Sequence, residues 1–183
     1  LILVSDWIRY RGVGNIVTYV VNRNINITNI CIGSCGFCAF RRAPHDPDAY
    51  CYSEEEVVSK AQEAWARGAT EVCIQGGLHP QFDAYYYRDL LKAIKLRVPK
   101  IHIHAFSPEE VHYGALRAGL SVEETLRMLK EAGLGSIPGT AAEILVESVR
   151  GRICPRKVDV STWTMIVKVA HRLGIPTTST IMY

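Results

Sequence analysis

Three cysteines within eight residues constrain this chain more than any other feature of its sequence. Cys31, Cys35 and Cys38 are spaced C-x3-C-x2-C, and Phe37 stands directly before the last of them. Cysteine thiolates bind soft or borderline metals and hold iron–sulfur clusters. An electron-transfer cluster normally has four cysteine ligands, and a structural zinc site is also closed by four ligands. Three clustered thiols therefore indicate a four-iron cluster whose fourth iron stays open to a substrate.

A zinc or electron-transfer module is the alternative of another class. Cys35 and Cys38, with His45 or Cys51 nearby, would supply zinc ligands, although the three-residue first spacing is awkward for a zinc knuckle. Such a module would be a binding protein and not an enzyme. It predicts bound zinc, or a cluster that is indifferent to an added small molecule.

Composition narrows the class of protein. The chain has 183 residues, of which 48% are hydrophobic and 21% charged, and this is enough for one globular core. Its net charge is only +3 with scattered basic residues, so we expect no nucleic-acid partner. No apolar run reaches the length of a membrane span, so we expect no membrane association. A thiolate cluster needs a reducing compartment, which predicts a cytoplasmic location.

Strand-like and helix-like segments alternate along the chain. Capping patterns such as Ser53-x-x-Glu56 start several of the expected helices. The sequence predicts a preliminary strand at 16–21, main strands at 22–29, 71–75, 100–106, 134–137 and 176–183, and helices at 53–67 and 83–98 and from residues 107, 121, 140 and 161. Alternation of this kind implies an α/β fold with parallel strands and crossover helices.

The cysteine motif resembles that of the radical S-adenosylmethionine (SAM) superfamily. The resemblance implies that Cys31, Cys35 and Cys38 hold a 4Fe-4S cluster and that Phe37 packs beside it. In that family the open iron binds the amino and carboxylate groups of SAM. An electron from the cluster then cleaves SAM to methionine and a 5′-deoxyadenosyl radical.

The resemblance also implies a fold, a partial or full βα (TIM-like) barrel. About five parallel strands are expected here, and a full barrel has eight. We therefore expect residues 1–183 to be the N-terminal part of a radical SAM barrel, with the C-terminal part missing and residues 1–21 as a short N-terminal segment. Such a piece would expose a sheet edge and fold poorly alone.

Two further segments match SAM-contacting positions of the family. Gln75, Gly76 and Gly77 end the expected strand 71–75, where a glycine pair lets a backbone approach a ligand closely. In the family this pair contacts the amino group of SAM. Glu143 follows the expected strand 134–137, where ribose contacts fall in the family. Because Thr140-x-x-Glu143 is also a capping pattern, Glu143 could instead only cap a helix.

Three histidines are candidates for lining the substrate site. His79 follows the glycine pair, although a loop histidine is more often only solvated. His102 and His104 lie two residues apart in an expected strand and therefore share one face. They could line a barrel interior or be hydrogen-bonded core histidines, and the sequence leaves both possibilities open.

Several local sequences resemble one subfamily of radical SAM enzymes. That subfamily contains the tyrosine-using component of FO synthase and two enzymes of the futalosine route to menaquinone. The matching segments include Asn22–Cys31, Phe37–Arg41, Gln75–Pro80, Ile101–Pro108, Pro138–Glu143, Ile153–Pro155 and Pro176–Tyr183. Within the subfamily, the segments at 139–143 and 153–155 look most like the FO synthase component.

This closer resemblance implies a reaction that forms a carbon–carbon bond. A 4-hydroxybenzyl group would pass from L-tyrosine to 5-amino-6-(D-ribitylamino)uracil, on the route to the FO precursor of coenzyme F420. It implies as partners a second radical SAM component of FO synthase and a reductant protein. The alternative is a menaquinone-pathway enzyme, either dehypoxanthine futalosine cyclase or aminofutalosine synthase. Substrate turnover would separate the two.

Overall fold

The computed structural model describes residues 1–182, with Tyr183 outside the described part, and its centre is a parallel sheet of three strands. These are β1 (Asn22–Asn26), β2 (Glu71–Gln75) and β3 (His102–Ala105), in the order β1-β2-β3. Cys73 pairs with Asn24 on one side and with His104 on the other. The sequence prediction of an α/β fold with parallel strands is confirmed.

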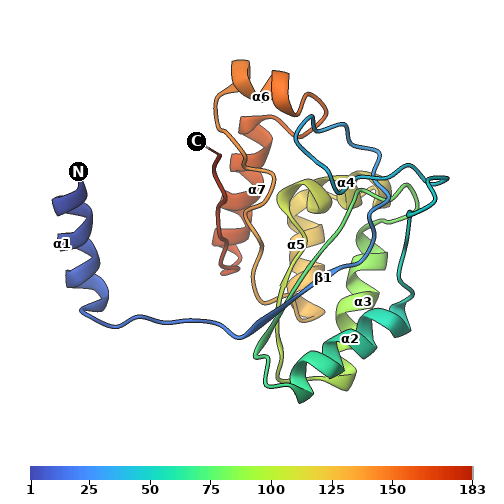
Figure 1. Ribbon diagram of the computed structural model, residues 1–183, viewed down its shortest axis with the longest axis horizontal. Helices are drawn as coiled ribbons and strands as arrows, with labels where there is room; N and C mark the ends of the chain where they lie inside the picture. The colour runs from blue at the N-terminus through green and yellow to red at the C-terminus, as the bar shows by residue number, and fades with distance from the viewer. Residues whose placement is uncertain (183) are drawn as a thin grey trace.

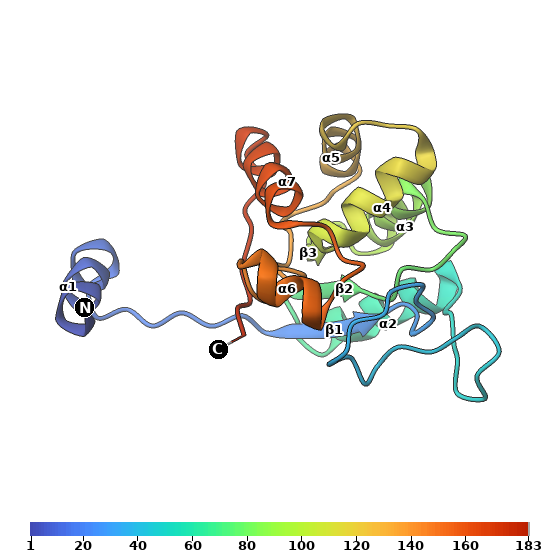
Figure 2. The ribbon, with the colours of Figure 1, turned by 90° about the horizontal axis from the view of Figure 1, so that it is seen from above.

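Two helices, α1 (Ile2–Val13) and α6 (Glu147–Ile153), contribute no residue to the main core. The helices that pack with the sheet lie on one of its faces, and they are α2 (Glu54–Ala66), α3 (Ala84–Arg97), α4 (Pro108–Ala118), α5 (Val122–Glu131) and α7 (Val160–Arg172). Alternate strand residues such as Val72, Ile74 and Ile103 are fully buried in the core that these helices form with the sheet. Figures 1 and 2 show α3, α4 and α5 together on that side of the strands.

Local capping signals fix where three of the helices begin. Ser53, Ser107 and Ser121 each accept a hydrogen bond from the backbone three residues on, and the glutamate there bonds back to the serine backbone. Each reciprocal pair satisfies two backbone donors that the first turn would otherwise leave free. The predicted starts of these helices are therefore confirmed. The last helix begins two residues earlier than predicted, because Asp159 and not Ser161 is the N-cap that accepts the capping bond.

The five predicted main strands and the barrel are not confirmed. At the fourth and fifth positions the described residues form only isolated parallel bridges, which join His104 with Ser136, Ile137 with Thr177, and Glu143 with Ile181. The Ile137 backbone exchanges both bonds with the segment at 176–178, but Pro138 follows and has no N–H to extend the ladder. The two segments thus lie in the order that a βα barrel would give them without forming full strands.

Residues 14–21 form an extended linker and not the strand predicted at 16–21. Their β-branched side chains are exposed, because the described chain offers them no neighbouring strand over most of this length. The linker carries α1 away from the body, and no α1 residue is buried (Figure 1). Within residues 1–182, no helix has the length and apolar character needed to cross a membrane.

Candidate active site

One cavity of about 230 Å³ gathers most of the residues singled out from the sequence. It lies where β1 and β2 end, so that loops distant in sequence meet at the carboxyl edge of the sheet. Eight predicted site residues line it: Cys31, Cys35, Phe37, Cys38, Gln75, Gly76, Gly77 and Glu143. The walls also include residues that the sequence did not single out, among them Ser107, Glu109, Glu110, Thr140 and Lys157.

Backbone contacts hold the first cysteine of the motif firmly. The Cys31 N–H donates to the carbonyl of Arg42 at 3.1 Å, and Ile32 donates to the carbonyl of Leu78 at the same distance. The Cys31 thiol sulfur accepts hydrogen bonds of 3.3 Å from the backbone N–H groups of Gly33 and Leu78. The backbone and the sulfur of Cys31 are therefore both held in place by neighbouring loop segments.

The second cysteine is half-buried beside a cation. Burial raises the pKa of the Cys35 thiol, and the nearby Lys157 ammonium opposes that rise. The loop is tied down here because Gly36 donates to the carbonyl of Ile153 at 2.8 Å. All six cysteines are free thiols. Among residues 1–182, no three His, Cys, Asp or Glu side chains converge on a point where one metal ion could sit.

The glycine pair after β2 has a steric reason to be glycine. A Cβ on Gly77 would lie 2.2 Å from the carbonyl oxygen of Ile30 and 2.8 Å from the Cβ of Cys31. A Cβ on Gly76 would lie 2.8 Å from Ile27. Real Cβ atoms do not approach so closely, so only glycine lets this loop pack against the segment that delivers the cysteines.

Hydrogen bonding at the glycine pair leaves its carbonyl oxygens available. The Gly76 N–H donates to Glu110 at 3.0 Å, and the Gly77 N–H donates to the carbonyl of Thr28 at 2.9 Å. Among the described residues no donor reaches the carbonyl oxygens of Gly76 and Gly77. Free backbone acceptors beside a cavity suit a ligand that carries an ammonium group. The pair therefore fits the amino group of SAM, as the resemblance implies.

Glu143 lies at the cavity, but it does not cap a helix. Residues 140–146 are irregular, and the helix predicted from 140 to 149 begins only at Glu147. Glu143 itself has a φ of 46°, and its carboxylate pairs with the Lys157 ammonium at 2.6 Å. Thr140 bonds instead to the Gln75 side chain at 3.3 Å. The capping interpretation is wrong, because this tertiary pairing prevails over the local pattern.

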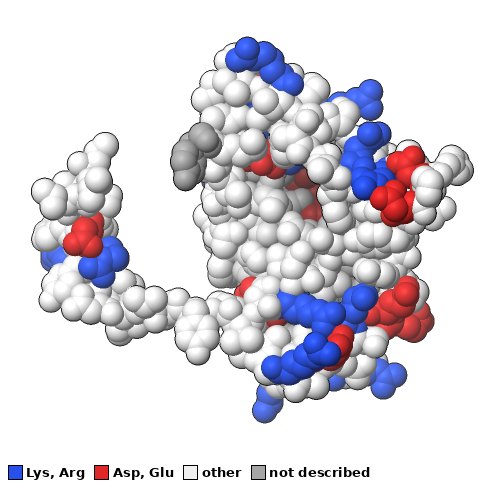
Figure 3. Space-filling view, in the orientation of Figure 1, with Lys and Arg blue, Asp and Glu red and all other residues white. Residues whose placement is uncertain are grey.

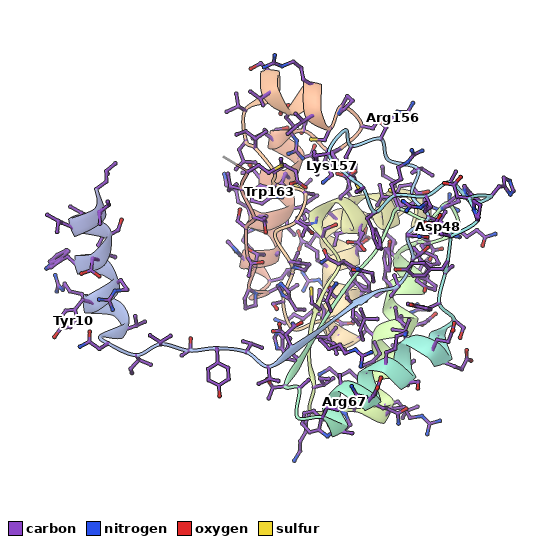
Figure 4. The ribbon with its side chains drawn as sticks, viewed as in Figure 1. Tyr10, Asp48, Arg67, Arg156, Lys157 and Trp163 are labelled. Atoms are coloured by element: carbon purple, nitrogen blue, oxygen red, sulfur yellow. The ribbon has the colours of Figure 1, made fainter. Side chains whose placement is uncertain are left out.

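Lys157 was not found from the sequence, and it links several parts of the cavity. Its ammonium lies 5.6 Å from the centre of the Phe37 ring in addition to its pair with Glu143. Figure 4 shows it in the segment between α6 and α7, beside the loop that follows β1. This segment is fixed by the buried Arg150, whose guanidinium donates to the carbonyls of Ala141, Ala142 and Val158. Only the folded chain brings these residues together.

The sequence predicted Glu110 only as a helix-capping residue and not as a residue of the site. Its side chain is buried and accepts hydrogen bonds from the Ser107 N–H and hydroxyl at 2.7 and 2.6 Å, and from Gly76. It therefore joins the start of α4 to the glycine loop. Burial raises the pKa of Glu110 to about 7, against the hydrogen bonds that lower it.

The raised pKa of Glu110 predicts a pH dependence of stability. Because this pKa is about 7 in the folded chain and 4.5 for a free side chain, the folded state binds more protons between those values. The stabilising contribution is therefore complete below pH 4.5 and is lost as the pH rises through 7. We expect that in Glu110→Gln the free energy of unfolding falls by up to about 3 kcal/mol less over this pH range than in the unsubstituted protein. Urea unfolding of both proteins across this pH range measures it, and parallel curves would contradict it.

None of the three candidate histidines is among the described residues that line the cavity. His79 is buried against Phe82, with ring centres 4.5 Å apart, and its Nδ1 accepts from the Gln81 N–H. The alternative that His79 is only a solvated loop residue is therefore wrong, and its role in lining the substrate site stays a prediction. His102 and His104 lie on the sheet face opposite the helices, and both bond to the Ser136 hydroxyl, at 2.7 and 2.6 Å.

Several known proteins are similar to this chain in sequence. The sequence profile of the Radical SAM superfamily matches residues 25–183. The chain is 53% identical over 183 residues to the 5-amino-6-(D-ribitylamino)uracil–L-tyrosine 4-hydroxyphenyl transferase of Methanothermobacter thermautotrophicus, covering 100% of this chain and 50% of that protein. It is 57% identical to the protein of the same name from Methanopyrus kandleri, covering 96% and 47%. It is 52% identical to an FO synthase of Streptomyces avermitilis, covering 98% and 21%.

Solved structures show the same fold at low sequence identity. The hydrogenase maturase HydG superposes with a TM-score of 0.71 at 18% identity, over 99% of this chain and 38% of its own. Methylornithine synthase (PylB) superposes with a TM-score of 0.65 at 17% identity, over 93% and 46%. The chain spans about half the length of the curated 4-hydroxyphenyl transferases that it matches. With the family profile covering most of its length, the chain belongs to the radical SAM superfamily.

Proposed function

We propose that this chain is part of a radical SAM enzyme that transfers the 4-hydroxybenzyl group of L-tyrosine to 5-amino-6-(D-ribitylamino)uracil. The observation that carries the proposal is identity of 51–57% to transferases named for these two substrates, across nearly the whole chain. The cavity supports it, because its lining residues include the three motif cysteines, the glycine pair and Glu143.

The cavity residues fit both cofactors. Cys31, Cys35 and Cys38 would hold three irons of a 4Fe-4S cluster and leave the fourth open. The carbonyls of Gly76 and Gly77 would accept from the amino group of SAM, and Glu143 would contact its ribose. When bound, the cluster and SAM supply the radical that takes a hydrogen atom from tyrosine.

The chain contributes shielding and orientation. Phe37, Phe40, Leu78 and Ala141 give the cavity an apolar part. An apolar, closed site keeps water away from a reactive intermediate. Arg150 fixes the irregular segment that carries Glu143, so this carboxylate is positioned before a ligand arrives. We place the reaction in the cytoplasm, with a reductant protein and a second radical SAM component as partners.

Loss of the Lys157 ammonium should weaken SAM binding. In Lys157→Met the Glu143 carboxylate, which is only 12% exposed, loses its charged partner and the orientation that comes with it. We expect the Kd for SAM to rise about tenfold, because truncating one member of a partly buried pair leaves the other uncompensated. Equilibrium dialysis with labelled SAM measures this. Exposed Lys168→Met on α7 is the control, and equal Kd values in both variants would contradict the assignment.

Turnover tests the proposed function directly. The complete polypeptide that contains this chain is reconstituted anaerobically with iron and sulfide, reduced, and given SAM, tyrosine and the aminouracil. The expected product is the aminouracil carrying a 4-hydroxybenzyl group, formed only when tyrosine is present. SAM cleavage with futalosine-pathway substrates, and none with tyrosine, would assign the chain to menaquinone synthesis. A colourless protein that retains zinc would exclude radical chemistry altogether.

A further inference from the structure

The sheet face that points away from the helices is polar, which is unusual for a βα fold. Side chains alternate along a strand, and Val72, Ile74 and Ile103 occupy the helix side. The other side presents Asn22, Glu71 and His102 at the start of the strands, and Asn24, Asn26, Cys73, Gln75 and His104 nearer the cavity. We call the second group the polar face. Parallel sheets are normally covered on both faces by bulky apolar side chains. A polar sheet face is therefore suited to bind a ligand and poorly suited to pack a core.

The polar face is continuous with the active-site cavity. Gln75 belongs to both, and its side chain bonds to Thr140 at the upper edge. Strand register places Asn24 and His104 on either side of Cys73, two residues before Gln75. With a rise of about 3.3 Å per residue, this row lies roughly 6.6 Å below the cavity floor. A five-carbon chain hanging from a ring held in the cavity would reach it.

His104 is held in place by a hydrogen-bond network. The Ser136 hydroxyl lies 2.6 Å from Nδ1 of His104 and 2.7 Å from Nε2 of His102. Since one hydroxyl has a single proton, it donates to one imidazole and accepts from the other when both are neutral. A Cβ on Gly135 would lie 2.4 Å from the His102 ring, so glycine makes room for it. Burial lowers the pKa of His104, against the Glu71 carboxylate that raises it, and this favours the neutral ring.

Neutral groups that both donate and accept match a particular kind of ligand. The amides of Asn24, Asn26 and Gln75, and the His104 imidazole, carry no charge at neutral pH. Figure 3 shows most Lys and Arg side chains at the upper and lower parts of the body, with acidic side chains in the hollow between them. Each hydroxyl of a polyol both donates and accepts, whereas a tyrosine ring offers one hydroxyl and needs apolar walls. The polar face thus favours a polyol over an aromatic side chain.

We infer that the polar face, with His104 held by Ser136, binds the polyhydroxylated chain of the second substrate below the site of radical formation. This rests on the proposed function, in which that substrate carries a ribityl group. The network then sets how deep the aminouracil sits, and so which ring atom is presented to the benzyl fragment. Tyrosine would occupy the more apolar part of the cavity near Phe37 and Leu78.

The test compares two ligands that differ only in the polyol chain. The complete polypeptide is reconstituted anaerobically, and the Kd is measured by equilibrium dialysis for 5-amino-6-(D-ribitylamino)uracil and for 5,6-diaminouracil. We expect His104→Ala and Ser136→Ala each to raise the Kd for the ribityl compound about tenfold, roughly 1.4 kcal/mol. The Kd for diaminouracil should change by no more than about twofold. His104→Gln keeps a donor and an acceptor and should retain most of the affinity. Exposed His45→Ala is the matched control.

The outcomes separate this inference from the proposed function. Equal losses for both ligands, no loss for either, or a change confined to the KM for tyrosine would overturn the polyol site. Cluster iron content and circular dichroism equal to those of the unsubstituted protein show that the variants are folded. Selective binding without transfer of a benzyl group would instead overturn the proposed reaction and leave the polyol site standing.

Discussion

Replacing any one of Cys31, Cys35 or Cys38 by alanine should abolish SAM cleavage. Each variant leaves two protein thiolates where the cavity offers three, so the cluster loses a covalent ligand that the other cavity residues cannot supply. Changes in groups that only support a metal ligand cost 10–100-fold, so we expect loss of a ligand to cost at least about 100-fold. Reductive SAM cleavage, iron content and the EPR spectrum of the reduced protein measure the loss.

The other cysteines provide matched controls for this prediction. Cys51 is exposed and Cys73 lies within β2, and neither lines the cavity. We expect Cys51→Ala and Cys73→Ala to retain a four-iron signal that shifts when SAM is added. If Cys51→Ala lost the signal while Cys38→Ala kept it, the cluster would be held by a different set of thiols.

Gly77→Ala should be the most damaging single methyl group that can be added to the cavity wall. The added carbon would lie 2.2 Å from the Ile30 carbonyl oxygen, which is backbone and has no side-chain rotamer to change. Either the glycine loop or the cysteine segment must move. We expect unfolding free energy to fall by about 3 kcal/mol, as for severe overpacking, together with loss of SAM binding. Urea denaturation and SAM dialysis measure the two effects.

Gly151→Ala is the control for the added methyl group. Gly151 lies in α6, and its Cβ would have no neighbour within 4 Å. Alanine has the better helix propensity, so this variant should be neutral or more stable by up to about 1 kcal/mol. Stability of Gly77→Ala equal to that of Gly151→Ala would show that the loop is not packed against the cysteine segment as described.

The sequence predicted those parts of the fold that depend on interactions between residues close together in the chain. Capping boxes at Ser53 and Ser107 depend on residues three apart, so helix starts could be predicted. The strand at 71–75 was also predicted with its bounds, because an apolar run ended by two glycines is typical of a buried strand. The segment 16–21 has the same β-branched composition but no partner strand, and sequence alone does not reveal a missing partner.

The candidate site was predictable only in part for a related reason. The cysteines and the glycine pair could be predicted as site residues from their spacing and position in the sequence, and the structure brings them to one cavity. Lys157 and Glu110 lie in segments whose local sequence explains them as a loop charge and a helix cap. Their contacts with Glu143 and Gly76 cross 14 and 34 positions, which no local pattern encodes.

The packing of the glycine loop against the Cys31 segment also limits how the sequence of the site can change. The Cys31 backbone and sulfur are held by Arg42, Gly33 and Leu78, and a Cβ on Gly77 would meet both Ile30 and Cys31. The position of the first thiol therefore depends on the backbone of a second loop and not on a side chain that could be exchanged. A substitution that shifts one of these loops would need a matching change in the other, so we expect the two segments to vary together among related sequences.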